Sequence, residues 1–295
     1  MDLADLKIFE AVARLGSMNQ AALEVNTVQS NVTARIRGLE DELGLPLFHR
    51  TSKGVSLTPA GERLLPFARR FAVLEDEARR AARDDGTPGG PLVLGSLETT
   101  AALRLSPLLA DFVGAYPGVE LTLRTGTSRE LVERVLGHEL EGAFVCGPVN
   151  HPELGEEVMF HEQLVLLSAP HLRSLDEILE DREVRIVVLR AGCSYRLILE
   201  AMLARRGVVE VRPMEFGTLE SIVSCVGAGL GITLLPRALI GAVWREGQVA
   251  VHEVPAKEGQ VETVFIRRRD AYVSSAMAAF LDRARSGLAR VDAAE

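Results

Sequence analysis

One short segment divides the chain into two parts with different sequence patterns. Residues 84–91 read Asp-Asp-Gly-Thr-Pro-Gly-Gly-Pro, which offers no apolar side chain for a core and several residues that interrupt helices and strands. Before this segment, apolar residues recur at helical spacing almost throughout. After it, short Val- and Leu-rich runs at 92–94, 120–123 and 186–189 alternate with helical patterns, which is typical of an α/β domain. We therefore predict two domains, joined by a hinge at residues 85–91.

The composition is that of a globular protein whose acidity lies mostly in its second part. Hydrophobic residues make up 47% of the 295 residues and charged residues 25%, which allows real cores and argues against disorder. The formal net charge is -8, and residues 1–85 carry 12 basic and 13 acidic side chains against 21 and 28 in the remainder. An acidic total argues against a general polyanion binder but leaves room for one small DNA-reading face.

The sequence shows no pattern typical of export, of a membrane span or of a metal site. The three cysteines, Cys146, Cys193 and Cys225, are too few and too scattered for a disulfide framework. Residues 1–7 lack the basic-then-apolar order of a signal peptide, and the longest uncharged run, 222–236, is too short to span a bilayer. The histidines have no metal-binding spacing. We therefore predict a cytoplasmic protein with no membrane contact, no metal and no cofactor.

The first 43 residues predict three helices. Gly16 follows the first at the position of a C-terminal cap. Ser17-Met18-Asn19-Gln20 has the capping-box pattern that begins a short second helix, which ends near Val25. The apolar residues that would form the shared core recur at helical spacing: Leu6, Phe9 and Val12 or Ala13 in the first helix, and Val32, Ile36, Leu39 and Leu43 in the third.

The opposite face of the third helix is polar and carries small or amide side chains. A helix that lies in the DNA major groove needs short side chains for close approach, amides for adenine edges, and arginine for guanine or phosphate. Any solvated helix also shows polar residues opposite its apolar stripe, and Arg35 or Arg37 could simply pair with Glu40 or Asp41. The helix by itself therefore favours neither interpretation. The outer face and first turn comprise Gln29, Ser30, Asn31, Thr33, Ala34 and Arg37.

The order of motifs over the first 61 residues is more specific than any one helix. After the first helix come Ala21-Ala22-Leu23, Gln29-Ser30-Asn31-Val32-Thr33, the run from Arg35 to Gly44, Leu47-Phe48-His49-Arg50, Lys53-Gly54 and Leu57-Thr58-Pro59-Ala60-Gly61. This series resembles the LysR-type transcriptional regulators, and the downstream α/β pattern extends the resemblance over essentially the full chain. The resemblance implies an all-α winged helix-turn-helix at residues 1–58 that binds a two-fold site in double-stranded DNA. It implies DNA contacts by Gln29, Ser30, Asn31, Thr33, Arg35 and Arg37, and phosphate contacts by Arg50 and Lys53 on the wing.

Residues 59–84 predict one long helix. Thr58 is suited to cap it and Pro59 to its first turn. The family resemblance implies that this linker helix pairs two subunits into a homodimer, that the regulator assembles as a dimer of dimers, and that RNA polymerase is a further partner. A helix that packed only on its own chain would leave a long rod beside a small core. The expected contact stripe is Leu64, Ala68, Phe71, Leu74 or Glu75, Ala78 and Ala82.

For residues 91–295 the resemblance implies an effector-binding domain of two α/β lobes, similar to periplasmic binding proteins. Lobe I would hold about 91–163 and 268–295, and lobe II about 164–267, with crossing strands near 147–167 and 261–267. In open α/β sheets, ligands bind where strand ends meet helix starts. The residues expected around such a cleft are Ser96, Glu98, Thr99, Thr100, Thr127, Ser128, Gly147, Cys193, Ser194, Tyr195, Arg196 and Thr218, with Pro148 and Gly217 on the rim.

The chemistry of the expected effector follows from the charged members of that set. Glu98 could receive an amine, whereas Arg196 or Arg124 could receive a carboxylate, so we expect an amine, an amino acid or a carboxylate. The turns around Glu98 and Cys193 most resemble the branch of putrescine-utilisation regulators. Glu98 could equally be a helix-dipole partner, and each hydroxyl a plain helix cap.

Two other functions fit parts of the sequence. An α/β enzyme with an accessory DNA-binding head is one, but no Ser-His-Asp set, paired carboxylates or phosphate loop supports it. A solute-binding module is the other, and the missing export signal counts against it. We therefore predict a regulator and not an enzyme. Cys193 and Cys225 are expected to be apolar fillers and not redox sensors.

Overall fold

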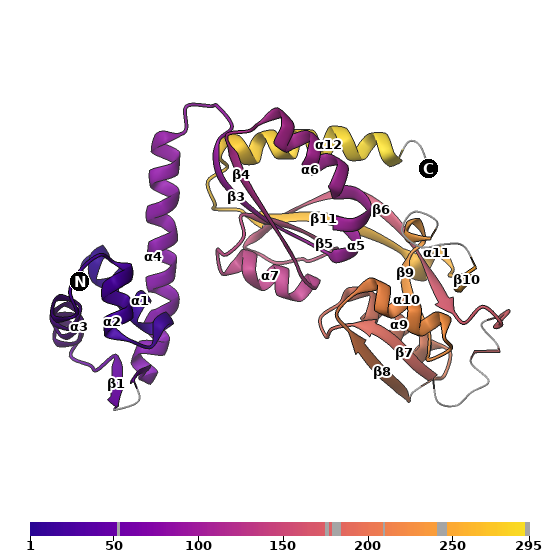
Figure 1. Cartoon of the computed structure of the whole chain (residues 1–295), viewed down its shortest axis with the longest axis horizontal. Coiled ribbons are helices and arrows are strands. Elements are labelled where there is room, and N and C mark those ends of the chain that lie inside the picture. Colours follow the sequence, from indigo (N-terminus) through magenta and orange to yellow (C-terminus); the bar gives the residue numbers. More distant parts are fainter. Residues whose placement is uncertain (52–53, 175–176, 179–183, 209, 241–246, 293–295) are drawn as a thin grey trace. The chain divides into compact units, whose positions relative to one another are not determined.

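The computed structural model describes residues 1–51, 54–174, 177–178, 184–208, 210–240 and 247–292. Contacts divide the chain into two compact units, Met1–Asp84 and Asp85–Glu295, whose elements are labelled in Figure 1. Across these described ranges, no helix combines the length and the apolar character that a membrane span requires.

The first unit is a three-helix head with a two-stranded wing and one long helix. Asp2 caps the first helix in a reciprocal capping box with Asp5, and the hydroxyl of Ser17 accepts the N–H of Gln20 at the start of the second. Gly16 and Gly44 end the first and third helices in the left-handed conformation that glycine tolerates best. The elements are α1 (Leu3–Leu15), α2 (Met18–Glu24), α3 (Gln29–Leu43), β1 (Phe48–Thr51), β2 (Gly54–Leu57) and α4 (Pro59–Arg83).

One apolar core holds this head together. Phe9 of α1 is fully buried, and its ring centroid lies 5.2 Å from that of Phe48 at the start of the wing. Val32 and Ile36 bring the inner face of α3 into the same cluster, as their spacing predicts. Gly61 lets α4 approach closely, because a Cβ atom there would lie 2.3 Å from the carbonyl oxygen of Leu47.

The apolar stripe expected on the linker helix is partly buried and partly exposed. Ala68 is fully buried in the core of its own head, and Leu64 packs against that core. Three large apolar side chains on the adjoining surface of α4 remain exposed: Phe67 by 60%, Phe71 by 41% and Leu74 by 58%. The sequence pattern treated these residues as one stripe and left Phe67 out. Their spacing of four and three residues places the exposed trio in a row along the helix.

The second unit is built on a seven-stranded mixed sheet. Its order is β10-β6-β11-β5-β3-β4, with β9 paired to β6, and a separate parallel pair is formed by β7 and β8. Pairing of β3 with β4 and β5 is parallel, and pairing of β6 with β11 is antiparallel. The strands are β3 (Gly90–Ser96), β4 (Val119–Thr125), β5 (Gly142–Cys146), β6 (Leu154–Ser168), β7 (Val184–Leu189), β8 (Val211–Phe216), β9 (Thr233–Pro236), β10 (Ala250–Glu253) and β11 (Gln260–Arg268).

Helices cover both faces of this sheet in lobe I, as Figure 1 shows. The alternation along β5 gives the reason, because Phe144 packs with Phe280 on one face while Ala143 and Val145 belong to the core on the other. The helices are α5 (Glu98–Thr100), the π-helix η1 (Ala101–Leu105), α6 (Ser106–Ala115), α7 (Ser128–Leu136), α9 (Ser194–Arg205), α10 (Leu219–Gly227), the 3-10 helix η2 (Arg237–Leu239), α11 (Ala256–Gly259) and α12 (Ser275–Asp292).

The strand β6 belongs to both lobes. Residues up to Gln163 pair with β11 beside β5, whereas residues from Leu164 onward pair with β9 and β10. Its hydrogen-bonding neighbours therefore change between Gln163 and Leu164. The parallel pair β7–β8 joins this second part through a bridge between Ile186 and Ile232.

Candidate DNA-binding face and effector cleft

The outer face of α3 is open to solvent. Gln29, Ser30, Asn31 and Arg37 are exposed and Thr33 is half-buried. The helix begins after Val28, which makes no side-chain capping bond, while the amide of Asn31 donates to the hydroxyl of Thr27 at 2.9 Å. A helix with small and amide side chains outward and its apolar line inward has the shape that close approach to a DNA groove requires.

Arg35 differs from Arg37 in its surroundings. Its guanidinium lies 2.7 Å from Asp5 and 3.2 Å from Asp2, so it ties α3 to the start of α1. The backbone N–H of Asp5, and after it Arg35, holds the pKa of Asp2 below its usual value. From the sequence, Arg35 was grouped with the DNA-contacting residues. Its ion-pair partners lie 30 or more positions away in the chain and could not be recognised from the local sequence. The structure instead gives it ion pairs inside the head.

Glu40 organises the entry to the wing. Its carboxylate accepts the N–H groups of Leu47 at 2.8 Å and Phe48 at 3.2 Å, and its other oxygen binds Arg50 at 3.1 Å. Arg50 therefore stands at the start of the wing with part of its guanidinium held. Lys53, the other predicted phosphate contact, lies outside the described residues.

A small cavity of about 30 Å³ lies between the lobes, which is room for about one water molecule. Five of the predicted effector residues line it: Glu98, Thr99, Thr127, Cys193 and Tyr195. The other lining residues are Leu97, Thr125, Gly126, Leu189, Arg190 and Gly217.

A buried polar cluster centred on Tyr195 adjoins this cavity. The Tyr195 hydroxyl donates to a carboxylate oxygen of Glu162 at 2.9 Å and lies 3.4 Å from the hydroxyl of Thr99. Thr263 donates to the same Glu162 oxygen at 3.4 Å. Burial, and after it the charge of Glu162, raises the pKa of Tyr195 well above its usual value. Helix α9, the turn after β3 and both long strands therefore share one hydrogen-bonded group.

A second contact between the lobes runs through two serines. The Ser194 hydroxyl donates to that of Ser128 at 2.9 Å, and Ser128 accepts the N–H of Cys146 at 3.2 Å. Several of the other predicted hydroxyls bond the backbone: Ser96 donates to the carbonyl of Leu97, while Thr127 and Thr218 cap α7 and α10. For Thr127 and Thr218 this is the plain capping role that the sequence left open for each hydroxyl.

The arginine that reaches the cavity is Arg190 and not Arg196. The guanidinium of Arg196 is bound by Glu200 at 2.8 Å and by Glu215, and Arg196 does not line the cavity. Arg124 is exposed on β4. The signal for Arg190 was its place directly after the run 186–189, where the end of a parallel strand faces a cleft.

Two further predicted residues do not line this cavity. Gly147 lines a different cavity, beside His161 and Leu197. Thr100 is fully buried in the turn that begins the lobe I helices. Burial raises the pKa of Cys146 to about 12 and also raises that of Cys193, so both thiols stay protonated at neutral pH.

Glu98 carries the acidic charge of the cavity. Burial and the nearby charge of Glu220 raise its pKa, while Arg190 and the N–H of Leu219 act in the opposite direction. The charged form of Glu98 is therefore less favourable in the folded protein than in the unfolded chain.

We expect Glu98→Gln to raise the melting temperature of the ligand-free protein at about pH 7. Glutamine carries no charge, so folding no longer has to bury part of a carboxylate at this position. Because the pKa of Glu98 is higher in the folded protein than in the unfolded chain, this carboxylate destabilises the fold only at pH values above its unfolded pKa. The destabilisation grows as the pH rises through the folded pKa. The gain over wild type should therefore vanish near pH 4. Paired melting curves, with the exposed Glu120→Gln as control, check this; a gain that persists at the acidic pH contradicts it.

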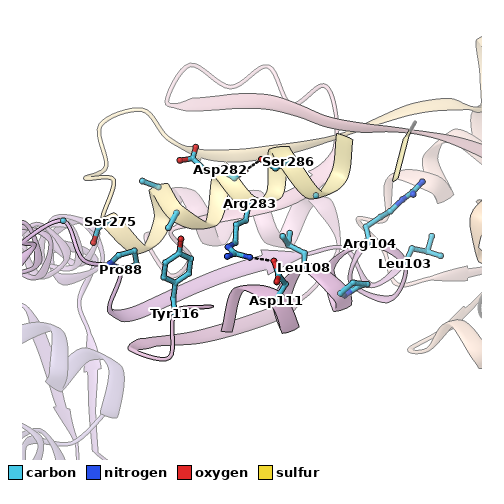
Figure 2. Close-up of a pocket in the computed structure, with 15 residues that line it drawn as sticks. Pro88, Leu103, Arg104, Leu108, Asp111, Tyr116, Ser275, Asp282, Arg283 and Ser286 are labelled. Atoms are coloured by element: carbon cyan, nitrogen blue, oxygen red, sulfur yellow. Dashed lines mark hydrogen bonds and ion pairs between the residues drawn. The ribbon is translucent and has the colours of Figure 1, made fainter. Parts of the chain in front are cut away.

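A larger cavity of about 730 Å³ lies on lobe I between α6 and α12. Figure 2 shows Arg283 of α12 directed at Asp111 of α6, with which it forms an ion pair. The same guanidinium lies 5.4 Å from the centre of the Tyr116 ring. Its charge is already neutralised, which distinguishes this groove from the cleft between the lobes.

Comparisons with known proteins cover both units. Residues 3–62 match the family described as "Bacterial regulatory helix-turn-helix protein, lysR family", and residues 85–289 match "LysR substrate binding domain". The chain is 41% identical to the HTH-type transcriptional regulator GltR of Bacillus subtilis over 97% of this chain and 96% of that protein. It is 40% identical to the regulator YofA of the same organism, over 96% and 98%.

Solved structures agree on the fold. A full-length variant of OxyR from Pseudomonas aeruginosa matches with a TM-score of 0.69 and 19% identity, over 98% of this chain and 94% of that one. Full-length CbnR complexed with its target DNA matches with a TM-score of 0.65 and 24% identity, over 97% and 100%. The predicted fold class is confirmed, and the relatives are named as regulators along nearly their whole length, which favours a regulator over the enzyme alternative. The chain belongs to the LysR family and is a DNA-binding transcriptional regulator with a C-terminal effector-binding domain.

Proposed function

We propose that this regulator binds a two-fold site in double-stranded DNA as a homodimer, with α3 of each subunit in a major groove. The observation that carries the proposal is the outer face of α3, where Arg37 is exposed while Arg35 is bound to Asp2 and Asp5. Base contacts would come from Gln29, Ser30, Asn31, Thr33 and Arg37. Phosphate contacts would come from Lys53 and from the N–H groups of Arg50 that Glu40 leaves available.

The exposed stripe of Phe67, Phe71 and Leu74 supports pairing through α4. Large apolar side chains that lie in a row on a helix favour burial against another surface. A second copy of the same helix supplies a matching row, and the isologous contact produces the two-fold symmetry that a palindromic operator requires. Association of two dimers, contact with RNA polymerase and a cytoplasmic location complete the proposal.

The matched pair Arg37→Ala and Arg35→Ala tests the DNA-binding face. We expect Arg37→Ala to weaken specific operator binding by about 1–3 kcal/mol, because a base or phosphate contact is lost. Arg35→Ala should lower the melting temperature of the head and leave the affinity of the folded protein nearly unchanged. Fluorescence anisotropy on a footprinted operator, at fixed salt, measures both. Equal losses from the two variants, or an unchanged Arg37→Ala affinity, would show that this face is misassigned.

We further propose that a small polar effector, an amine, an amino acid or a carboxylate, binds between the lobes. The contacts of Tyr195 with Thr99 and of Ser194 with Ser128 support this, because both run from lobe II to lobe I. A ligand that replaces such contacts favours one angle between the lobes over another. Differential affinity for the two angles is what couples the effector to DNA binding.

A further inference from the structure

The cavity between the lobes carries one charge of each sign, contributed by opposite lobes. Glu98 is half-buried in the turn after β3 of lobe I, and Arg190 directly follows β7 of lobe II. Threonines 99, 125 and 127 lie in the same lining. Arg196 is bound by two carboxylates, whereas Arg190 lines the cavity, so Arg190 is the cleft's anion-binding candidate.

We propose that the effector is a zwitterionic amino acid, whose ammonium group binds Glu98 and whose carboxylate binds Arg190. This inference rests on the proposed role of the cleft as the effector site. A guanidinium is the side chain best suited to a carboxylate, since it offers parallel N–H donors, and a carboxylate accepts the N–H groups of an ammonium. The threonine hydroxyls supply neutral donors and acceptors around the two charged ends.

The alternative ligand classes each meet a like charge. A diamine would place its second ammonium group toward Arg190, and a dicarboxylate would place one end toward Glu98. Glu220 adds to the second penalty, because its charge already acts on Glu98 and raises the Glu98 pKa. Like charges brought together in a partly buried site cost more than in water. A ligand with one charge of each sign avoids both penalties.

The size of the cavity gives the proposed ligand a mechanical role. The cavity of about 30 Å³ is smaller than an amino acid, so we expect binding to move the two lobes apart. Glu98 accepts the N–H of Leu219 in lobe II, and an incoming ammonium group would take over this carboxylate. A zwitterion bound by one residue of each lobe then fixes the distance between the lobes. Such a ligand binds one arrangement of the lobes more tightly than another, which is what a shift between two states requires.

The test uses the full-length protein in a thermal-shift screen, followed by calorimetric titration. The panel holds the common L-amino acids, putrescine and succinate, and for each amino acid that binds, its N-acetyl derivative and its amide. We expect at least one amino acid to raise the melting temperature by mass action. The N-acetyl derivative lacks the ammonium group and the amide lacks the carboxylate, so each should bind about tenfold to a hundredfold more weakly.

Substitutions show which residue binds each charged end of the ligand. Glu98→Gln should weaken binding of the amino acid and leave the affinity for its N-acetyl derivative unchanged. Arg190→Gln should weaken binding of the amino acid and leave the affinity for its amide unchanged. The exposed Glu120→Gln and Arg269→Gln serve as matched controls and should bind as wild type does.

Three results overturn the proposal: no amino acid of the panel binds at millimolar concentration, putrescine or succinate binds as tightly as the best amino acid, or either cleft variant retains full affinity. If putrescine or succinate binds instead, and Glu98→Gln or Arg190→Gln abolishes that binding, the proposal of a zwitterionic effector is wrong. The cleft would still be the effector site. The Arg37→Ala comparison on DNA is independent of all these outcomes.

Discussion

Replacing Phe67 and Phe71 together with aspartate is expected to convert the protein to monomers and to weaken operator binding by about a hundredfold or more. Both rings lie exposed on α4, so the substitution adds charge at the surface and removes no buried side chain of the core. Two heads that no longer share a dimer bind the two half-sites as separate molecules. The loss of effective concentration, and not the loss of any DNA contact, produces the effect.

Light scattering coupled to size exclusion measures the assembly, and anisotropy on a two-fold operator and on a single half-site measures the affinity. Half-site affinity should be close to wild type while two-fold affinity collapses. The variant Phe67→Leu with Phe71→Leu keeps an apolar stripe and should remain a dimer. If the aspartate variant still migrates as a dimer, α4 is not the pairing element.

Phe9→Ala should destabilise the DNA-binding head by about 3–5 kcal/mol. Phe9 is fully buried and packs on Phe48, which begins the wing, so the cavity would open between α1 and the wing. A head of this size has roughly 5–10 kcal/mol in all, so most of its stability would be lost. Operator binding should then fail at temperatures where the effector-binding unit remains folded.

Chemical denaturation followed by far-ultraviolet circular dichroism, on the full chain, checks the Phe9 prediction. The head's transition should move to lower denaturant while the transition of the second unit stays in place. Leu23→Ala is the control, because Leu23 is 71% exposed on α2 and its truncation should change stability by less than about 0.5 kcal/mol. Comparable shifts in the two variants would show that the core is not centred on Phe9.

The helices of the head were predictable because their signals are local. Gly16 and Ser17 mark one boundary, and Val32, Ile36 and Leu39 repeat at steps of four and three residues, which a helix and not a strand places on one face. Burial along the linker helix was less predictable, because Ala68 is fully buried while its neighbour Phe67 is exposed. Which apolar residues of α4 become buried depends on how α1 packs against this helix. The sequence of α4 alone does not contain that information.

The cleft shows the same division between local and distant determinants. Glu98 and Tyr195 were found because each follows a strand end that the sequence makes visible. Arg196 was named as a carboxylate partner and Arg190 was not, although both follow the same strand. Of the two carboxylates that neutralise Arg196, Glu200 stands four residues away on the same helix and could have been recognised, whereas Glu215 comes from β8. Glu162 was not identified from the sequence, because its hydrogen-bond partner Tyr195 is distant in sequence and comes beside it only in the folded protein.

The changeover of partners along β6 gives the regulator a simple way to transmit a signal. One unbroken strand serves both lobes, so a change in the angle between them would bend the backbone around Gln163 and Leu164, together with the second crossing, where β11 begins opposite Gln163. Glu162 is the preceding residue, and it receives the hydrogen bond of the cleft residue Tyr195. On the proposed effector role of this cleft, the ligand-binding surface and the bend in β6 would be neighbours along one strand, and the signal would need no relay of intermediate residues between them.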